Sequence, residues 1–97
     1  MAGTDMTVAN EIRRQLGNKA LVMIGALGFV GSENSLSFRI GRNCKRINAI
    51  RIILTPADLY DVEFFRVRDR TVVTREGIYN DMLHSVIETE TGMRTSL

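Results

Sequence analysis

The chain has 97 residues, of which 44% are hydrophobic and 25% are charged, and these are ordinary values for one globular domain with a single core. The mean hydropathy is −0.02, and no apolar run approaches the ~20 residues that a membrane-spanning helix needs. No basic segment followed by an apolar stretch indicates a signal peptide. The single cysteine, Cys44, has no partner for an internal disulfide, so we expect a reducing, cytoplasmic setting.

The formal net charge is only +2, but the charges are unevenly distributed along the chain. Residues 34–57 contain five basic side chains and no acid, and residues 66–75 contain four arginines against one aspartate. Residues 76–97 carry four acids against one arginine. A basic middle and an acidic C-terminal end predict a dipolar surface rather than a uniformly basic one.

The N-terminal part of the chain predicts one helix and one short strand. Residues 1–6 carry no pattern and are expected to be a disordered end, so a single domain is expected over residues 7–97. Apolar residues at helical spacing predict a helix over residues 7–16, which the Gly17-Asn18 pair ends. The continuous apolar run over residues 20–24 predicts a buried strand, and the glycines that follow predict a turn or a bulge.

The middle of the chain predicts a series of strands connected by turns. Strict alternation predicts a strand over residues 36–40, looser alternation predicts a second over residues 47–54, and a third begins at Tyr60. The alternation of the third strand breaks at Phe64-Phe65, which indicates a bulge or a point where its outer face is covered. Residues 71–74 are rich in β-branched side chains and predict a last strand or the end of that hairpin.

The C-terminal part predicts a second helix. Apolar residues from Ile78 to Ile87 follow an amphipathic helical pattern, which ends near Gly92. Hairpin-connected strands with a helix at each end imply a sheet that the helices cover on one face. The expected fold class is therefore α+β, with a three- to four-stranded antiparallel sheet flanked by an N-terminal and a C-terminal helix.

Groups that carry catalysis or bind metals are sparse. His84 is the only histidine, and at helical spacing it shares a face with Asp81 and Glu88. Without a second histidine, a solvated helix face is favoured over a metal site. Cys44 lies among cations that favour a reactive thiolate, but a catalytic cysteine also needs a base within reach. We therefore expect no catalytic residue, no metal and no cofactor, and a protein that is not an enzyme.

Basic side chains are the main candidate for a binding surface. Arg39 and Arg51 point outward from successive predicted strands, and further cations occupy the turn between them. Antiparallel pairing would bring these groups to one end and one face of the sheet, where they could contact phosphates or a protein. The residues that we expect to bind a partner or a nucleic acid are Arg39, Arg42, Lys45, Arg46, Arg51, Arg66 and Arg68.

A second predicted surface follows from the strand pattern. Two adjacent phenylalanines cannot both face the helices unless a bulge intervenes, so one of Phe64 and Phe65 is expected on the uncovered side of the sheet. Ile53 is expected on the same side. An apolar patch of this kind favours a homodimer, or failing that a partner-binding patch, around Ile53 and Phe65.

The predicted order of helix, three strands and helix is similar to that of double-stranded-RNA-binding domains. That family places a lysine-rich motif at the start of its second helix, where this chain has the acidic Ile78-Tyr-Asn-Asp81. It also has a histidine-containing loop between its first two strands, which this chain lacks. The RNA contacts of that family are therefore carried onto no residue of this chain.

Several strings spread over most of the chain resemble small accessory proteins of bacteriophages and other bacterial mobile elements. The strings are Ala20-Leu-Val-Met-Ile-Gly25, Leu36-Ser-Phe-Arg-Ile40, Leu54-Thr-Pro-Ala-Asp58 followed by Tyr60-Asp-Val-Glu-Phe64, Glu76-Gly-Ile-Tyr79 with Asp81-Met-Leu83, and Glu90-Thr-Gly92. Small proteins of this setting often bind a host protein, and they include inhibitors of CRISPR effectors and other defences. The resemblance supplies the setting, a bacterial cytoplasm. Together with the segregated charges and the sparse catalytic groups, it leads us to expect a non-enzymatic module that occludes or modulates a host protein or ribonucleoprotein. Direct binding of DNA or RNA by the basic hairpin is the alternative.

Overall fold

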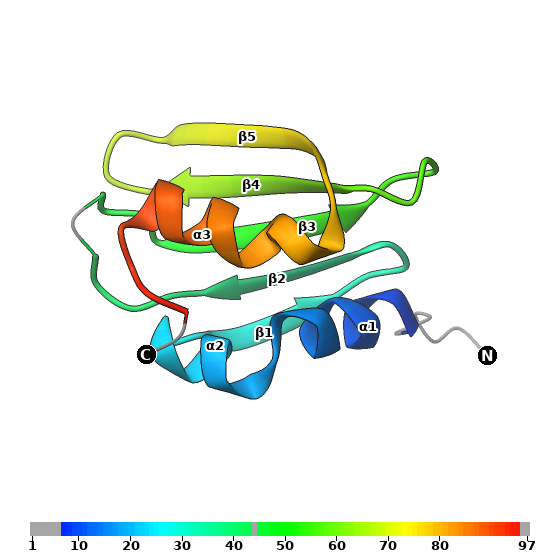
Figure 1. Cartoon of the computed structure of the whole chain (residues 1–97). Coiled ribbons are helices and arrows are strands. Elements are labelled where there is room, and N and C mark those ends of the chain that lie inside the picture. The colour runs from blue at the N-terminus through cyan, green and yellow to red at the C-terminus, as the bar shows by residue number, and fades with distance from the viewer. Residues whose placement is uncertain (1–6, 44, 96–97) are drawn as a thin grey trace.

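The computed structural model describes residues 7–43 and 45–95. Its elements in chain order are α1 (Thr7–Leu16), α2 (Asn18–Met23), β1 (Leu27–Gly31), β2 (Ser35–Arg39), β3 (Ala49–Leu54), β4 (Tyr60–Arg66), β5 (Thr71–Ile78), the 3-10 helix η1 (Asn80–Met82) and α3 (Leu83–Thr91). The strands form one antiparallel sheet in the order β1-β2-β3-β4-β5, so the fold is α+β as predicted (Figure 1). The predicted disordered end at residues 1–6 lies outside the described residues.

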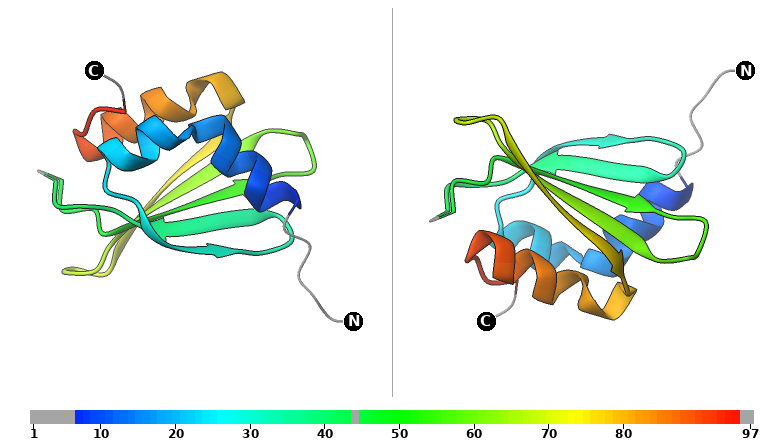
Figure 2. Two further views of the ribbon diagram at one scale, coloured as in Figure 1. Left: turned by 90° about the horizontal axis from the view of Figure 1, so that it is seen from below. Right: turned by 90° about the horizontal axis from the view of Figure 1, so that it is seen from above.

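The helices lie together on one face of the twisted sheet, and no described helix covers the opposite face, which we call the open face (Figure 2). The core between the two layers includes Ile12 and Leu16 of α1, Phe38 of β2, Phe64 of β4 and Ile87 of α3. Burying a side chain of this size contributes roughly 1.5–3 kcal/mol. The radius of gyration is 12.7 Å, close to the ~12.5 Å of a compact chain of this length. None of the helices in the described ranges is long and apolar enough to cross a membrane.

The prediction of a strand over residues 20–24 is wrong, because this run forms α2. Gly17, with a φ of 84°, separates α2 from α1, and only glycine adopts this conformation freely. Ala20, Leu21 and Ile24 face the core at helical spacing, whereas Val22 between them is 79% exposed. A short apolar run does not distinguish a buried strand from a helix that buries most of its residues, and the tertiary packing decided in favour of the helix.

The glycine-rich segment, expected to be a turn or a bulge, has the bulge and also contributes the additional strand β1. This strand pairs with β2 at the edge of the sheet, which therefore has five strands rather than three to four. The register shifts between Leu27 and Val30, where Gly28 has a φ of 65°. A bulge of this kind suits an edge strand, and it hides the alternation by which strands are recognised in a sequence.

The strand β4 has no bulge at Phe64-Phe65, contrary to one of the two interpretations of this pair. Phe64 pairs with Ile50 of β3 and faces the core, and Phe65 pairs with Ala49 and lies half-buried on the open face. The irregularity lies instead between Tyr60 and Val62, in the pairing with β5. Simple alternation therefore continues through both phenylalanines, and the second one is an apolar residue of the open face.

Candidate functional site

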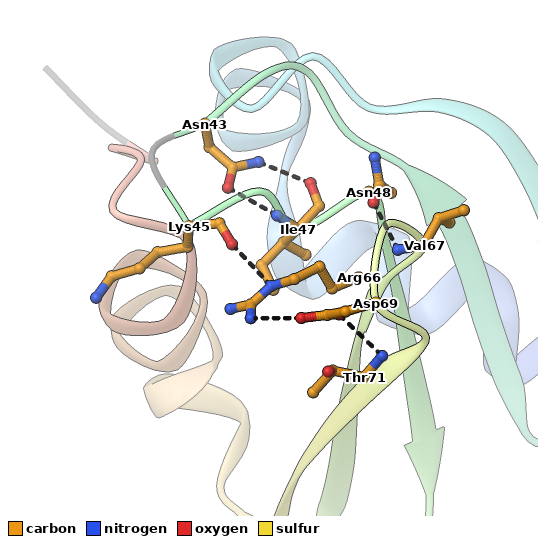
Figure 3. A network of polar contacts seen from close by, with 8 residues as sticks. All are labelled: Asn43, Lys45, Ile47, Asn48, Arg66, Val67, Asp69 and Thr71. Carbon is orange, nitrogen blue, oxygen red and sulfur yellow. Dashed lines mark hydrogen bonds and ion pairs between the residues drawn. The ribbon is translucent and has the colours of Figure 1, made fainter.

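The loop between β2 and β3 is organised by Asn43. Its side-chain Nδ2 donates a hydrogen bond to the carbonyl of Ile47 at 2.8 Å, and its Oδ1 accepts the N–H of Ile47 at 3.0 Å (Figure 3). Nδ2 also donates to the carbonyl of Gly41 at 3.0 Å. Ile47 is buried in the core and anchors the end of the loop. Arg46 has a φ of 60°, a left-handed conformation that is uncommon for a residue with a side chain. These polar contacts therefore tie the start of the loop to its end.

The turn between β4 and β5 is tied to this loop by two hydrogen bonds that involve side chains. Asn48 accepts the N–H of Val67 through its Oδ1 at 2.8 Å, and Arg66 donates from Nε to the carbonyl of Lys45 at 3.1 Å (Figure 3). These contacts join residues that are 19 and 21 positions apart in the sequence. The loop and the turn are consequently fixed to each other, and they form the two walls of a cleft.

Asp69 holds the turn itself. Its carboxylate accepts the N–H of Thr71 at 3.2 Å and lies 3.3 Å from Nη1 of Arg66 (Figure 3). Hydrogen bonds from Thr71, followed by those from Arg66, hold the pKa of Asp69 below its ordinary value. The charge of Arg66 is thereby compensated within the turn.

A cleft with a volume of about 470 Å³ lies between the two walls. We call it the basic cleft, and its lining residues are Ile40, Gly41, Arg42, Asn43, Arg46, Ile47, Asn48, Val67 and Arg68. Next to it is a second hollow of about 400 Å³, the apolar hollow, which is lined by Leu27, Arg39, Ile40, Asn48, Ala49 and Val67. The two share Ile40, Asn48 and Val67, so they form one continuous depression at this end of the sheet.

The arginines of the basic cleft have no acidic partner among the described residues, unlike four other arginines. Within the described residues, acidic side chains form ion pairs with Arg14, Arg51, Arg66 and Arg75. In the same part of the chain, no acidic side chain pairs with Arg42, Arg46 or Arg68, and all three are exposed. Uncompensated positive charge is therefore concentrated where the cleft opens to solvent.

The structure brings together four of the seven basic residues that were proposed from the sequence. Arg42, Arg46 and Arg68 line the basic cleft, and Arg39 lines the apolar hollow beside it. The remaining three, Lys45, Arg51 and Arg66, have other surroundings.

Each of these three residues lies outside the lining of the depression for a different reason. Lys45 belongs to the same loop and is exposed, but only its carbonyl takes part in the network. Arg51 lies farther along β3, with its Nη1 3.7 Å from Oε1 of Glu63. Arg66 folds back to connect the two walls, so it supports the cleft rather than lining it.

The side chain of Arg39 packs against Gly28 on the neighbouring strand β1. A Cβ atom at Gly28 would lie 3.2 Å from Nε and 3.3 Å from Nη2 of Arg39, closer than most such contacts. The guanidinium therefore lies against the backbone of β1, in space that any other residue at position 28 would partly fill. Because Gly28 also has a positive φ, two independent requirements favour glycine here.

Sequence reasoning missed the uncharged residues of the depression. Asn43 and Asn48 flank the basic loop, and asparagines that bond to nearby backbone groups are typical of such turns, so their role had a recognisable signal. Val67 had none, because a valine at the end of a strand predicts a core residue, whereas here it is 69% exposed.

His84 has a structural contact that the prediction of a solvated helix face did not include. Its Nε2 lies 2.6 Å from the carbonyl oxygen of Leu16 and joins α3 to the end of α1. A carbonyl only accepts hydrogen bonds, so Nε2 carries the proton. In the described residues no three His, Cys, Asp or Glu side chains form a group that could hold a metal ion. Cys44 lies outside the described residues.

No protein-family model, curated protein or solved structure matches this chain. The resemblance to accessory proteins of bacteriophages and mobile elements therefore stays a prediction.

Proposed function

We propose that the protein is a non-enzymatic binding module that holds an acidic stretch of a protein partner in the basic cleft. The observation that carries this proposal is that Arg42, Arg46 and Arg68 line one cleft without an acidic partner from the described residues. Guanidinium groups form charge-assisted, often bidentate hydrogen bonds with carboxylates. An acidic segment would supply the counter-charges that the chain itself provides to other arginines.

The surroundings of the cleft favour a protein partner over a nucleic acid. Exposed Leu27 and Val67 line the apolar hollow, and arginine beside apolar side chains is typical of protein interfaces. Proteins that read single-stranded nucleic acids use aromatic side chains for base stacking. None of the residues that line the basic cleft or the apolar hollow is aromatic.

The setting that we propose comes from the sequence resemblance. Small proteins of bacteriophages and mobile elements work inside a bacterial cytoplasm, where their partners are host proteins or ribonucleoproteins. A defence effector such as a CRISPR nuclease is the specific class of partner that we propose, and occlusion of one of its surfaces is the mechanism. This role requires no cofactor and no catalytic group.

Two arginine variants form a matched test of the cleft. Arg46 and Arg70 both have left-handed backbones, with φ of 60° and 57°, and glycine relieves the same strain at either position. Arg46→Gly and Arg70→Gly therefore remove the same charge with the same effect on the backbone, but only Arg46 lines the cleft. Any difference in binding between the two variants reports on the cleft itself.

The assay is affinity capture from a bacterial lysate, followed by titration of the purified partner. Arg70→Gly should bind like the wild type. Arg46→Gly should bind roughly 10- to 100-fold more weakly, because a hydrogen bond to a charged group contributes roughly 1.5–3 kcal/mol. Equal affinity of both variants for the partner would exclude the basic cleft as its binding site.

Nucleic-acid binding is the second candidate, and the same three arginines on two facing walls favour it. A protein that neutralises three phosphates loses affinity roughly 40-fold between 50 and 200 mM salt. Fluorescence anisotropy with labelled single- and double-stranded DNA and RNA at these two concentrations measures the slope. Binding with this salt dependence, weakened by Arg46→Gly and not by Arg70→Gly, would replace the protein-binding proposal. No binding at 50 mM salt would remove the nucleic-acid candidate.

A further inference from the structure

The open face of the sheet carries two ordered rows of side chains that cross all five strands. The row nearer the basic cleft consists of Leu27, Arg39, Ala49, Phe65 and Val72. The next row consists of Val30, Ser37, Arg51, Glu63 and Thr74. The first row is mostly apolar, and the second places opposite charges side by side on the two central strands.

The charges on this face compensate one another. On the strands β2 to β4, Arg39 and Arg51 balance Asp61 and Glu63, so the centre of the face has no net charge that would oppose the approach of an identical face. The distance from Nη1 of Arg51 to Oε1 of Glu63 is 3.7 Å, longer than a charge-assisted hydrogen bond. Both groups therefore keep the capacity to form a closer pair with a group from outside the chain.

The apolar residues of this face are incompletely covered. Leu27 is 62% and Val72 is 51% exposed, and Phe65 between them is half-buried. Ile53, the other residue expected in a self-association patch, is half-buried beside Asp61 in a third row. An antiparallel sheet with one solvated face ordinarily presents polar side chains on that face. The exposed row of apolar side chains therefore indicates a surface that binds a partner.

We infer that the open face binds the open face of a second copy of this chain, about a two-fold axis that runs along the strands between β3 and β4. Such an axis lays β3 of one copy over β4 of the other. Arg51 then lies opposite Glu63 of the second copy, and the same pair forms again in the reverse direction. Ala49 lies opposite Phe65 of the second copy, so a small side chain meets a large one. The face is thus complementary to itself in both charge and size, as a two-fold interface requires.

The size of the face indicates how strong this dimer is. Strands of six to seven residues at the centre and five strands across give a footprint of roughly 20 Å by 20 Å. This area is at the lower end of the sizes of specific protein interfaces, and complexes with interfaces of this size are weak. We therefore expect a dissociation constant on the order of 1–100 µM.

The dimer has a consequence for the basic cleft, although the inference does not depend on the proposed function. The loop between β2 and β3 and the turn between β4 and β5 lie at the same end of the sheet (Figure 1). An axis along the strands keeps that end of both copies together, so the dimer covers Leu27, Arg39 and Ala49 of the apolar hollow and presents the two basic clefts side by side. A partner with two acidic segments would then gain affinity from bivalent attachment.

Sedimentation equilibrium between 5 and 500 µM tests the inference. The wild-type mass should rise from 10.9 kDa toward twice that value. Arg51→Glu and Glu63→Arg each place like charges across the axis and should weaken the dimer at least 10-fold, and the double exchange should restore it. Phe65→Ser should also weaken it, and unfolding curves of every variant establish that the monomer remains folded.

Two results would overturn the inference. One is a wild-type mass that stays at 10.9 kDa up to 500 µM. The other is a dimer that neither Phe65→Ser nor the single charge variants weaken, because it would then use a different surface. Arg46→Gly provides the control that separates this inference from the proposed function, since it should leave the mass of the protein unchanged while it weakens binding to the partner.

Discussion

Replacing Asn43 with alanine should loosen the loop that forms one wall of the basic cleft. The substitution removes three hydrogen bonds, two to the carbonyls of Gly41 and Ile47 and one from the N–H of Ile47. A typical hydrogen bond contributes about 1 kcal/mol net. The side chain is partly exposed, so water replaces part of this contribution, and we expect the free energy of unfolding to fall by about 2 kcal/mol. For a domain of this size the melting temperature then falls by roughly 8–16 °C.

Urea unfolding followed by circular dichroism measures this change, with Asn34→Ala as the matched control. Asn34 is exposed in the turn between β1 and β2, and its amide oxygen accepts one long hydrogen bond from Ser32 at 3.4 Å. The control should therefore lose less than about 0.5 kcal/mol. If Asn43→Ala were no less stable than Asn34→Ala, the loop would not be organised by the Asn43 side chain, and the preformed wall would have to be abandoned.

Two further predictions concern the cleft and the C-terminal helix. Gly28→Ala should lower the free energy of unfolding by roughly 1–3 kcal/mol, because alanine is strained at a φ of 65° and its Cβ would press on Arg39. Urea unfolding measures this change, and a midpoint equal to that of the wild type would contradict the close packing of Gly28 against Arg39. Hydrogen bonds from Thr95 hold the pKa of Glu88 below its ordinary value of 4.5, so its contribution is complete above pH 4.5 and is lost as the pH falls through the lower folded-state pKa. Between pH 6 and pH 3, the free energy of unfolding should therefore fall less for Glu88→Gln than for the wild type. An equal fall in both proteins would mean that other groups cause the acid sensitivity.

The sequence by itself determined those elements whose local pattern has one interpretation. Ala9, Ile12 and Leu16 bury one face of α1, and the helical prediction for residues 7–16 matches it. Alternation located β2 and β3 within one to two residues, because one side of each strand faces the core. Helical spacing, together with Gly92 at a φ of 72°, likewise located the end of α3. The α+β class follows from these elements, since hairpin-connected strands between helices leave few other arrangements.

Only the tertiary structure decided the features whose local pattern has two interpretations. Residues 20–24 satisfy both a buried strand and a short helix, and packing beside α1 selected the helix. The same holds for charge. A run of arginines in the sequence predicts a basic region, but it does not reveal which acid lies opposite which arginine.

Strand register pairs Arg51 with Glu63, and the turn after β4 directs Arg66 to Asp69. These contacts leave Arg42, Arg46 and Arg68 uncompensated around one cleft. The walls of that cleft depend on hydrogen bonds between residues 19 and 21 positions apart. A local pattern extends over a few residues, whereas register and loop closure depend on the packing of the whole sheet, and for this reason the charges were predictable and the cleft was not.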